Sequence, residues 1–223
     1  MLYIVGTPLG NLRDLSPRAL EVLGNVDYVV AEDTRVTRKL LSRFHISTRT
    51  ISFHAHSRER DLAKILTFLR AGKVVAYVVD AGTPGISDPG GYLVRAVSQA
   101  LPDVPIVPIP GPSALTAALS VSGIVGSSFL FLGFPPHKKG RDAFFKEVYV
   151  SSHPVVLYES PHRLLRTLSD LGSHNMGTRE IILAKELTKM HEKTWRASPE
   201  KLLKTLPLEG PIRGEYVIIV PTP

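Results

Sequence analysis

The chain has 223 residues, no cysteine and a formal net charge of +7 at pH 7. This length suits one large domain or two small ones. The lack of cysteine excludes disulfide bonds, thiolate metal sites and cysteine nucleophiles. No apolar run approaches the roughly 20 residues of a membrane helix, and the first residues lack a basic leader, so we expect a soluble, cytoplasmic protein. The positive charge favours an anionic partner such as nucleic acid but does not identify it.

The first half of the chain alternates short valine- and isoleucine-rich runs with amphipathic segments. A helix is predicted after Ser16, a typical N-cap residue, with Pro17 at its first position and Gly24 as a stop. Helices are also expected over 58–71, where leucines recur on one face, and from about Tyr92. Strands are predicted over 2–5, 28–31, 50–53, 74–79 and 106–109. This alternation indicates a parallel sheet.

The second half of the chain is predicted to form a separate α/β domain. A small-residue helix over 115–121 leads into 122–128, whose glycines and serines are typical of a flexible join, so we place a boundary between domains 1–122 and 123–223. Helices are expected over 142–150 and 162–171. Strands are expected over 129–132, 155–158, 181–184, 194–197 and 216–220. Because several strands follow closely, this sheet is predicted to be mixed. Two such domains would form a cleft, a common place for a small-molecule site.

The loop that begins at Asp80 is the most informative segment. An apolar run ends at Val79, and the Gly/Pro-rich stretch 80–91 is longer than most strand-to-helix connections. The loop 6–11 follows the first strand, so both loops should lie at one edge of the sheet. Neither has the lysine of a phosphate-binding loop or the glycine spacing of a dinucleotide site. A ligand such as S-adenosylmethionine, held by backbone groups and one or two carboxylates, fits better, although tight turns are the alternative interpretation.

Eight motifs, in order along nearly the whole chain, resemble the small-subunit ribosomal RNA (cytidine 2′-O) methyltransferases of the tetrapyrrole methylase superfamily. They occupy 2–12, 31–35, 51–54, 80–90, 110–114, 133–134, 158–163 and 185–189. The resemblance implies two α/β domains with a cofactor cleft between them, a homodimer, and S-adenosylmethionine as cofactor. It also implies that the cofactor contacts Leu9, Asp80, Thr83, Ser113, Ala114 and Tyr158. For Asp80, a loop-capping role is the alternative.

Two basic clusters and one arginine are candidates for RNA binding. Arg35, Arg38, Lys39 and Arg43 recur at helical spacing, and Lys138, Lys139 and Arg141 follow His137 in a loop. Such side chains bind phosphates and position RNA without reading its sequence. A solvated helix face and a solvated loop are the alternatives. Arg163, which follows Pro161 and His162 at the start of a helix, is a candidate for holding the target nucleotide, or a surface arginine.

The sequence leaves the residues of the reaction itself open. Methyl transfer to a ribose hydroxyl benefits from a proton acceptor, and the sequence does not rank its candidates, which are Glu32, His54, Glu159 and Lys189. His54 and His56 share the spacing of a strand face, but no third ligand is recognisable, so no metal is predicted. Besides RNA methylation, methylation of a tetrapyrrole or protein-derived acceptor and a non-catalytic RNA-binding role remain open.

Overall fold

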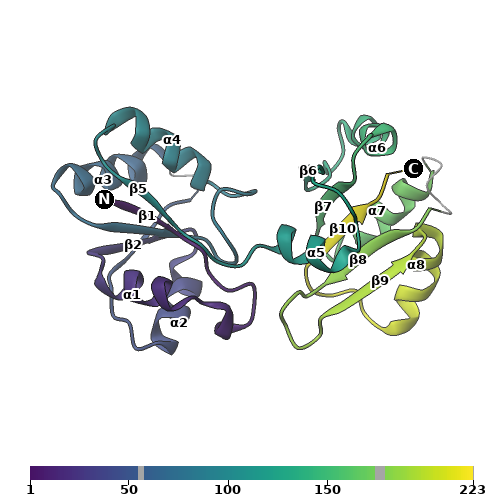
Figure 1. Cartoon of the computed structure of the whole chain (residues 1–223), viewed down its shortest axis with the longest axis horizontal. Coiled ribbons are helices and arrows are strands. Elements are labelled where there is room, and N and C mark those ends of the chain that lie inside the picture. Colours follow the sequence, from purple (N-terminus) through teal and green to yellow (C-terminus); the bar gives the residue numbers. More distant parts are fainter. Residues whose placement is uncertain (55–57, 174–178, 223) are drawn as a thin grey trace. The chain divides into compact units, whose positions relative to one another are not determined.

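The computed structural model describes residues 1–54, 58–173 and 179–222. The chain forms two compact units, Met1–Ser113 and Ala114–Pro223 (Figure 1). In the described part of the chain, none of the helices combines the length and the apolar character that crossing a membrane requires.

The boundary between the units differs from the predicted one. It lies after Ser113 rather than after Ser122, because helix α5 (Ala114–Ser122) contacts strand β10 (Tyr216–Val220) of the second unit. Leu115 and Ala118 of this helix are buried. The Gly/Ser segment 123–128 is therefore a loop inside unit 2. Its composition indicated a flexible join between the domains, but the join between the units lies before α5, after Ser113.

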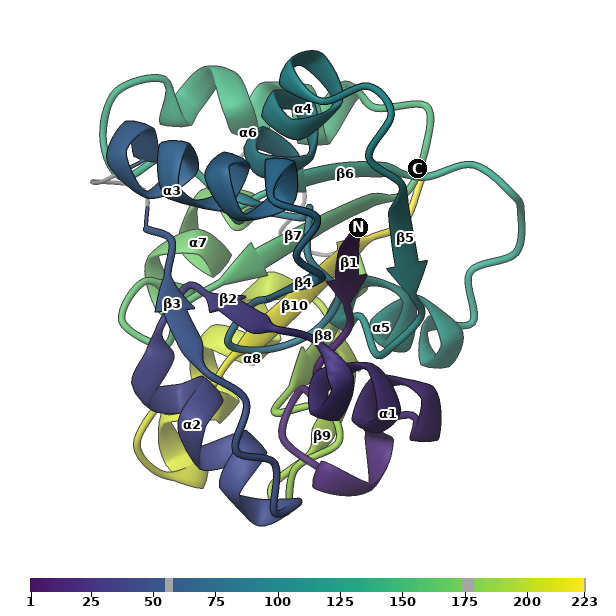
Figure 2. The ribbon, with the colours of Figure 1, turned by 90° about the vertical axis from the view of Figure 1, so that its left-hand side faces the viewer.

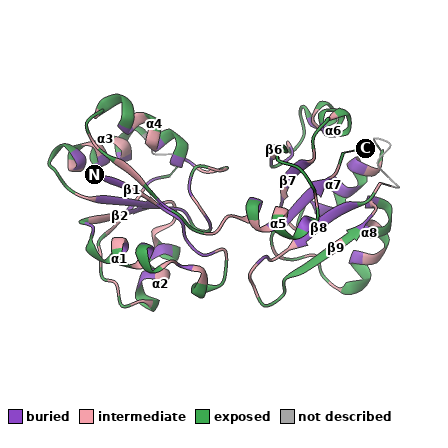
Figure 3. Ribbon diagram, viewed as in Figure 1, coloured by how far each residue is buried: buried purple, intermediate pink, exposed green. Residues whose placement is uncertain are grey.

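Unit 1 has a five-stranded parallel sheet in the order β3-β2-β4-β1-β5. Its strands are β1 (Leu2–Val5), β2 (Tyr28–Ala31), β3 (Thr50–Ser52), β4 (Val75–Val78) and β5 (Ile106–Ile109). The predicted parallel sheet is confirmed. The central strand β4 is buried at every position because helices cover both faces of the sheet. Its neighbour β2, labelled in Figure 3, is largely purple for the same reason.

Four α-helices cover this sheet, two on each face (Figure 2). They are α1 (Pro17–Asn25), α2 (Thr34–Arg43), α3 (Arg58–Arg70) and α4 (Gly90–Ala100), and a short 3-10 helix, η1, spans Leu12–Asp14. Leu23 of α1 and Leu41 of α2 belong to one core cluster, whereas Ile65 of α3 and Leu93 of α4 belong to another. Ser16 caps α1 by accepting a hydrogen bond from the Ala19 N–H at 3.1 Å, as its sequence predicts.

Unit 2 has a mixed five-stranded sheet in the order β6-β7-β10-β8-β9. β6 (Leu130–Gly133) is parallel to β7 (Val155–Glu159), and the other neighbours are antiparallel: β10, β8 (Ile181–Lys185) and β9 (Lys193–Ala197). The helices are α5, α6 (Arg141–Val150), α7 (Leu164–Leu171) and α8 (Pro199–Thr205), followed by a 3-10 turn, η3 (Leu206–Glu209). Phe145, Leu168 and Leu202 join α6, α7 and α8 in one core.

Candidate functional site

Three loops of unit 1 meet at one edge of its sheet. They follow β1, β4 and β5, which are neighbours and run parallel, so their carboxyl ends lie side by side. β1 and β4 lead into helices on opposite faces of the sheet (Figure 2). In open α/β sheets a ligand crevice forms outside the strand ends where the connections diverge in this way. The prediction that the loops starting at Gly6 and Asp80 share an edge is confirmed.

Hydrogen bonds tie these loops to one another. Thr7 and Gly82 form an isolated antiparallel bridge, with N–H to carbonyl distances of 2.9 and 3.1 Å. The Thr7 hydroxyl also donates to the Val79 carbonyl at 3.0 Å, which joins the β1 loop to the end of the β4 segment. The Thr83 hydroxyl donates to the carbonyls of Gly111 at 3.2 Å and Pro112 at 2.9 Å. Thr83, a predicted cofactor residue, therefore joins the β4 loop to the β5 loop.

Glycine is required where two of these loops cross. A Cβ atom on Gly6 would lie 2.7 Å from the Cα atom of Gly111, closer than real Cβ atoms come. The contact is between backbone segments, which cannot move aside as a side chain can. Gly82 has a φ of +86°, and a Cβ there would lie 3.2 Å from a methyl carbon of Leu9. The backbones of the β1 and β5 loops are thus closer at Gly6 and Gly111 than any side chain would permit.

Asp88 organises the remainder of the loop that follows β4. Its carboxylate accepts hydrogen bonds from the N–H groups of Gly85 at 2.8 Å, Ile86 at 2.9 Å and Gly90 at 2.6 Å. These bonds satisfy donors at the start of α4 and hold the loop in one conformation. Sequence reasoning missed this role, although an Asp-Pro-Gly run just before a helix is a recognisable signal for it.

Carboxylates gather at the same edge. Glu32 and Asp33 follow β2, and the Asp80 carboxylate accepts a hydrogen bond from the Asp33 N–H at 3.2 Å. Burial raises the pKa of Glu32, and the negative charges of Asp80 and Asp88 raise it further. Burial is also the main cause that raises the pKa of Asp80. Carboxylates are thus clustered at this edge in a chain of positive net charge, and such a cluster suits a cationic ligand.

A cavity of about 260 Å³ opens beside these carboxylates. Leu9 and Asp80, both predicted cofactor residues, line it together with apolar side chains of α2 and the β1 loop. Thr83 and Ser113 are not among its lining residues, and Ala114 and Tyr158 belong to unit 2. The lining residues are Pro8, Leu9, Gly10, Leu12, Val36, Thr37, Lys39, Leu40, Arg43, Val79 and Asp80.

The basic residues of α2 divide into two kinds. Arg35 is paired with Asp33, its neighbour at the helix N-terminus, at 2.7 Å, and Arg38 donates to the carbonyl of Thr34 at 3.0 Å. Lys39 and Arg43 are exposed and also line the cavity. Of the predicted cluster, the pair Lys39 and Arg43 therefore lies at the rim of the cavity, whereas the Arg35 charge is balanced by Asp33.

In unit 2, aromatic side chains lie where the parallel strands β6 and β7 end. The Tyr158 ring makes edge-to-face contacts with Phe131, at a centroid distance of 4.9 Å, and with Phe134, at 5.6 Å. Phe131 and Tyr158 are 27 positions apart in the chain, and the pairing of β6 with β7 brings them together.

Beneath these rings lies a buried polar network. The Glu159 side chain is fully buried and accepts hydrogen bonds from the Ser160 N–H at 2.7 Å and from the Thr167 hydroxyl at 2.5 Å. It also pairs with Arg163 at 2.9 Å. The Thr167 hydroxyl in turn accepts from Arg141 at 2.7 Å, and Arg141 pairs with Asp170. A buried charge of this kind is tolerated only when it is paired and hydrogen-bonded.

This network determines what the second set of predicted RNA-binding residues can do. The Arg141 side chain is only 6% exposed and the Arg163 side chain 17% exposed, and the guanidinium groups of both donate to partners inside unit 2. Lys138 and Lys139 are exposed. The structure therefore separates the loop cluster into exposed lysines and a buried arginine, which the sequence could not distinguish.

The four candidate proton acceptors lie in different surroundings. Glu159 is enclosed in the network described above. Burial lowers the pKa of Lys189, but hydrogen bonds to Glu186 at 2.9 Å and Glu215 at 3.0 Å outweigh this and raise it, so the lysine stays charged. The Glu159 and Lys189 side chains are thus both engaged in contacts within unit 2. Glu32 remains, as does His54, whose Nδ1 lies 2.8 Å from the Glu32 carbonyl oxygen.

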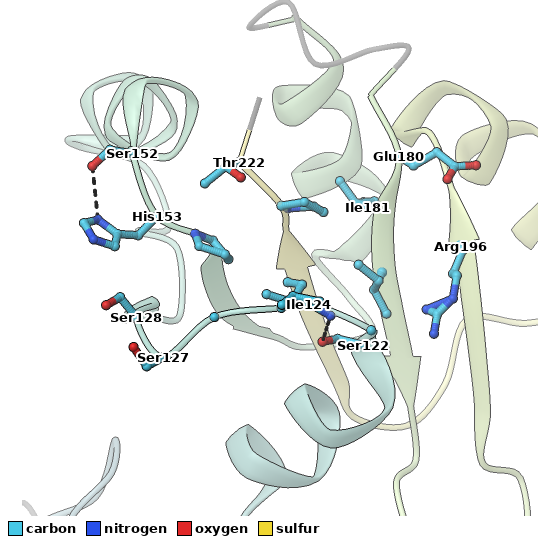
Figure 4. Close-up of a pocket in the computed structure, with 16 residues that line it drawn as sticks. Ser122, Ile124, Ser127, Ser128, Ser152, His153, Glu180, Ile181, Arg196 and Thr222 are labelled. Atoms are coloured by element: carbon cyan, nitrogen blue, oxygen red, sulfur yellow. Dashed lines mark hydrogen bonds between the residues drawn. The ribbon is translucent and has the colours of Figure 1, made fainter.

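A metal centre and a second cavity are the remaining candidates for a site. His56 lies outside the described residues, and within residues 1–54, 58–173 and 179–222 no group of three or more His, Asp or Glu side chains could hold a metal ion. Unit 2 contains a cavity of about 550 Å³, and Figure 4 shows residues that line it. It lies where β6 and β7 begin, at the edge of the sheet opposite to Phe134, and the predicted site residues are absent from its described lining.

Comparisons with known proteins agree on the family. The sequence profile of the family described as Tetrapyrrole (Corrin/Porphyrin) Methylases matches residues 1–203. Proteins named ribosomal RNA small subunit methyltransferase I are similar over nearly the whole chain. The one from Synechocystis is 43% identical over 99% of this chain and 78% of its own length, and the one from Thermotoga maritima is 42% identical over 98% of this chain and 97% of its own length.

Solved structures of the same fold are more distant in sequence. A diphthine synthase superposes with a TM-score of 0.78 at 16% identity, covering 99% of this chain and 89% of its own. A cobalt precorrin-4 methyltransferase superposes with a TM-score of 0.68 at 16% identity, covering 98% of this chain and 94% of its own. On its sequence and on its two α/β units, the chain belongs to the tetrapyrrole (corrin/porphyrin) methylase family.

Proposed function

We propose that this protein transfers a methyl group from S-adenosylmethionine to the ribose 2′-hydroxyl of a cytidine in small-subunit ribosomal RNA. One observation carries the proposal: relatives named ribosomal RNA small subunit methyltransferase I match it at 41–45% identity over at least 98% of the chain. The solved structures named for tetrapyrrole acceptors and diphthine are only 16–21% identical, although they share the fold.

The carboxyl edge of unit 1 fits the proposed methyl donor. S-adenosylmethionine supplies a methyl group on a positively charged sulfonium, and its amino acid and ribose parts carry hydrogen-bond donors. Asp80 and Glu32 give this edge the opposite charge, and partial burial strengthens the attraction. Leu9 and Val79 supply apolar contact beside Asp80. Ser113, Ala114 and Tyr158 are kept as donor contacts on the strength of the family resemblance.

Thr83 takes a different part in this proposal. Its hydroxyl proton has two carbonyl acceptors in the β5 loop, at 2.9 and 3.2 Å. We therefore assign Thr83 to holding the loops around the donor rather than to recognising the donor through its hydroxyl proton. The same reasoning applies to Thr7, whose hydroxyl donates to the Val79 carbonyl at 3.0 Å. We therefore assign Thr7 to holding the loops as well.

The RNA contacts that we propose are exposed cations. Lys39 and Arg43 on α2, and Lys138 and Lys139 in unit 2, are free of the buried pairs that hold Arg141 and Arg163. Such side chains neutralise phosphates and position the RNA backbone. We also propose that the protein acts in the cytoplasm on ribosomal RNA or on the small subunit, and that it is a homodimer, which light scattering on the purified protein tests directly.

Transfer of a radiolabelled methyl group tests the proposed activity. Purified protein is incubated with small ribosomal subunits and labelled S-adenosylmethionine, and the RNA is digested to nucleosides. The expected result is label in 2′-O-methylcytidine. Label in a tetrapyrrole or a protein would show that this molecule, and not ribosomal RNA, is the methyl acceptor. RNA binding without any methyl transfer would indicate a non-catalytic protein.

A further inference from the structure

An exposed aromatic ring lies in a basic surface of unit 2. Phe134 is 48% exposed, although its position directly follows the buried end of β6. Lys138 and Lys139, in the same loop, are exposed as well. Exposed aromatic rings beside cations are a combination that favours single-stranded nucleic acid, because bases stack on the ring while phosphates pair with the cations.

An irregularity in β6 determines the side to which the Phe134 ring points. The pairing of β6 with β7 shifts register between Phe131 and Gly133, where Gly133 has a φ of +66°. Side chains in a regular strand alternate between faces, so residues three apart point to opposite sides. The bulge adds a residue and cancels this alternation, so that Phe131 and Phe134 both contact Tyr158. Tyr158 thus packs against the exposed Phe134 ring.

Three arginines hold the loop that follows Phe134. Arg163 donates to the Pro135 carbonyl at 2.9 Å, Arg141 to the Pro136 carbonyl at 2.8 Å, and Arg166 to the His137 carbonyl at 3.2 Å. The guanidinium of Arg163 also lies 5.8 Å from the centroid of the Phe134 ring. Consecutive carbonyls of one loop are therefore bound to a helix and to a buried network. This arrangement lowers the conformational entropy that binding would otherwise cost.

We propose that Phe134 is a stacking platform for a nucleobase of single-stranded RNA, with Lys138 and Lys139 on the neighbouring phosphates. Arg141, Arg163 and Arg166 are positioning residues that act through the loop and need not touch the RNA. This inference rests on the proposed function, because it assigns a subsite for the RNA of that reaction. The positive charge of this surface favours RNA over other occupants, because an apolar peptide would gain nothing from the two exposed lysines.

Phe129 provides a matched control for the test. It is the same residue type, is 42% exposed, and lies just before the opposite end of β6. We expect Phe134→Ala to weaken binding of a fluorescein-labelled single-stranded oligocytidine by about tenfold or more, as removal of a stacking ring does. Phe129→Ala should bind as the parent protein does. Phe134→Trp should retain the affinity, since any aromatic face can stack, and it separates stacking from a general loss of structure.

The same variants are then assayed with small subunits. Phe134→Ala should raise KM for the subunit more than it lowers kcat, and its affinity for S-adenosylmethionine should stay within about twofold of the parent. Equal RNA affinity in Phe134→Ala and the parent would overturn the inference, as would a Phe134→Trp variant that binds as poorly as the alanine variant.

Oligomeric state and methyl transfer are measured alongside RNA affinity. A change of oligomeric state in Phe134→Ala with unchanged RNA affinity would assign the ring to a contact between copies of the chain, and would overturn the subsite. Failure of the parent to methylate ribosomal RNA would overturn the proposed function alone, provided that RNA binding still depended on Phe134.

Discussion

At the scale of single residues, the carboxylates at the edge of unit 1 are the feature that most constrains the ligand. Asp80 and Glu32 have raised pKa values because they are partly buried near other carboxylates. Such an arrangement is unfavourable in the free protein, and a bound cation relieves it. The position of Asp80 at the end of β4 was evident from the sequence. Its hydrogen bond to the Asp33 N–H and the proximity of Glu32 depend on the pairing of β2 with β4, which sequence patterns do not specify.

Asp80→Asn should weaken the binding of S-adenosylmethionine by about tenfold, the size of a lost hydrogen bond to a charged group. The asparagine oxygen can still accept the Asp33 N–H, so the loop should keep its conformation. Calorimetric titration measures the affinity. Asp103→Asn, the same change at an exposed residue that precedes β5, is the control. An unchanged affinity in Asp80→Asn would remove Asp80 from the donor site.

Donor affinity should also depend on pH. The ionised forms of Glu32 and Asp80 attract a cation, and their raised pKa values mean that they gain protons at a higher pH than ordinary carboxyl groups. Affinity should therefore fall as the pH is lowered, beginning above the value of 4.5 for an unperturbed glutamate. Titrations between about pH 5 and 8 measure this. Glu32→Gln should make the dependence shallower, and an identical profile in this variant would show that Glu32 plays no part.

At the scale of elements, most strands and helices follow from local sequence, but the contacts between them do not. Strands 2–5, 28–31, 106–109 and 216–220 lie as predicted, because short β-branched runs bounded by turn residues are unambiguous. Helix α8 was overlooked, although Ser198 and Pro199 repeat the signal of Ser16 and Pro17. The burial of Arg141 and Arg163 was beyond prediction, because their partners lie on other turns and elements.

The crossing of the β1 and β5 loops gives a prediction about stability. Gly6→Ala should destabilise the protein by about 1–3 kcal/mol, since its Cβ atom would lie 2.7 Å from the Gly111 backbone. Gly24→Ala is the control. Gly24 lies in α1 with open space around it, so alanine there should stabilise the protein by about 0.5–1 kcal/mol. Urea unfolding measures both. A Gly6→Ala variant as stable as the parent would mean that the loops can separate without cost.

The buried network of unit 2 gives a second prediction about stability. Thr167→Val keeps the shape of the side chain but removes the hydroxyl that joins Arg141 to Glu159, so it should cost about 1–3 kcal/mol. Thr67→Val removes an exposed hydroxyl that bonds only within α3, and should stay within about 0.5 kcal/mol of the parent. Urea unfolding compares the two variants. Equal stabilities would show that the network adds nothing to the fold.

At the scale of the whole molecule, the two units have different sheets and present different charged groups. Unit 1 gathers carboxylates at the ends of a parallel sheet beside the exposed Lys39 and Arg43 of α2, whereas unit 2 presents lysines and an exposed ring near the ends of its parallel pair, β6 and β7. The net charge of +7 describes neither surface by itself. The net charge therefore favours an anionic partner for the chain but gives no information on the clustered carboxylates of unit 1, which suit a cationic ligand.

The salt dependence of RNA binding tests this division of charge. For single-stranded RNA the slope of log affinity against log salt is about −0.7 for each neutralised phosphate, so the double change of Lys138 and Lys139 to alanine should make the slope less steep by about 1.4. Changing Lys201 and Lys204 of α8 to alanine lowers the net charge equally at exposed residues outside the proposed surface. Fluorescence anisotropy of oligocytidine over a range of salt concentrations measures the slopes. If the slope becomes less steep by the same amount in both double variants, the lysines act through net charge alone, and the loop is not a specific RNA contact.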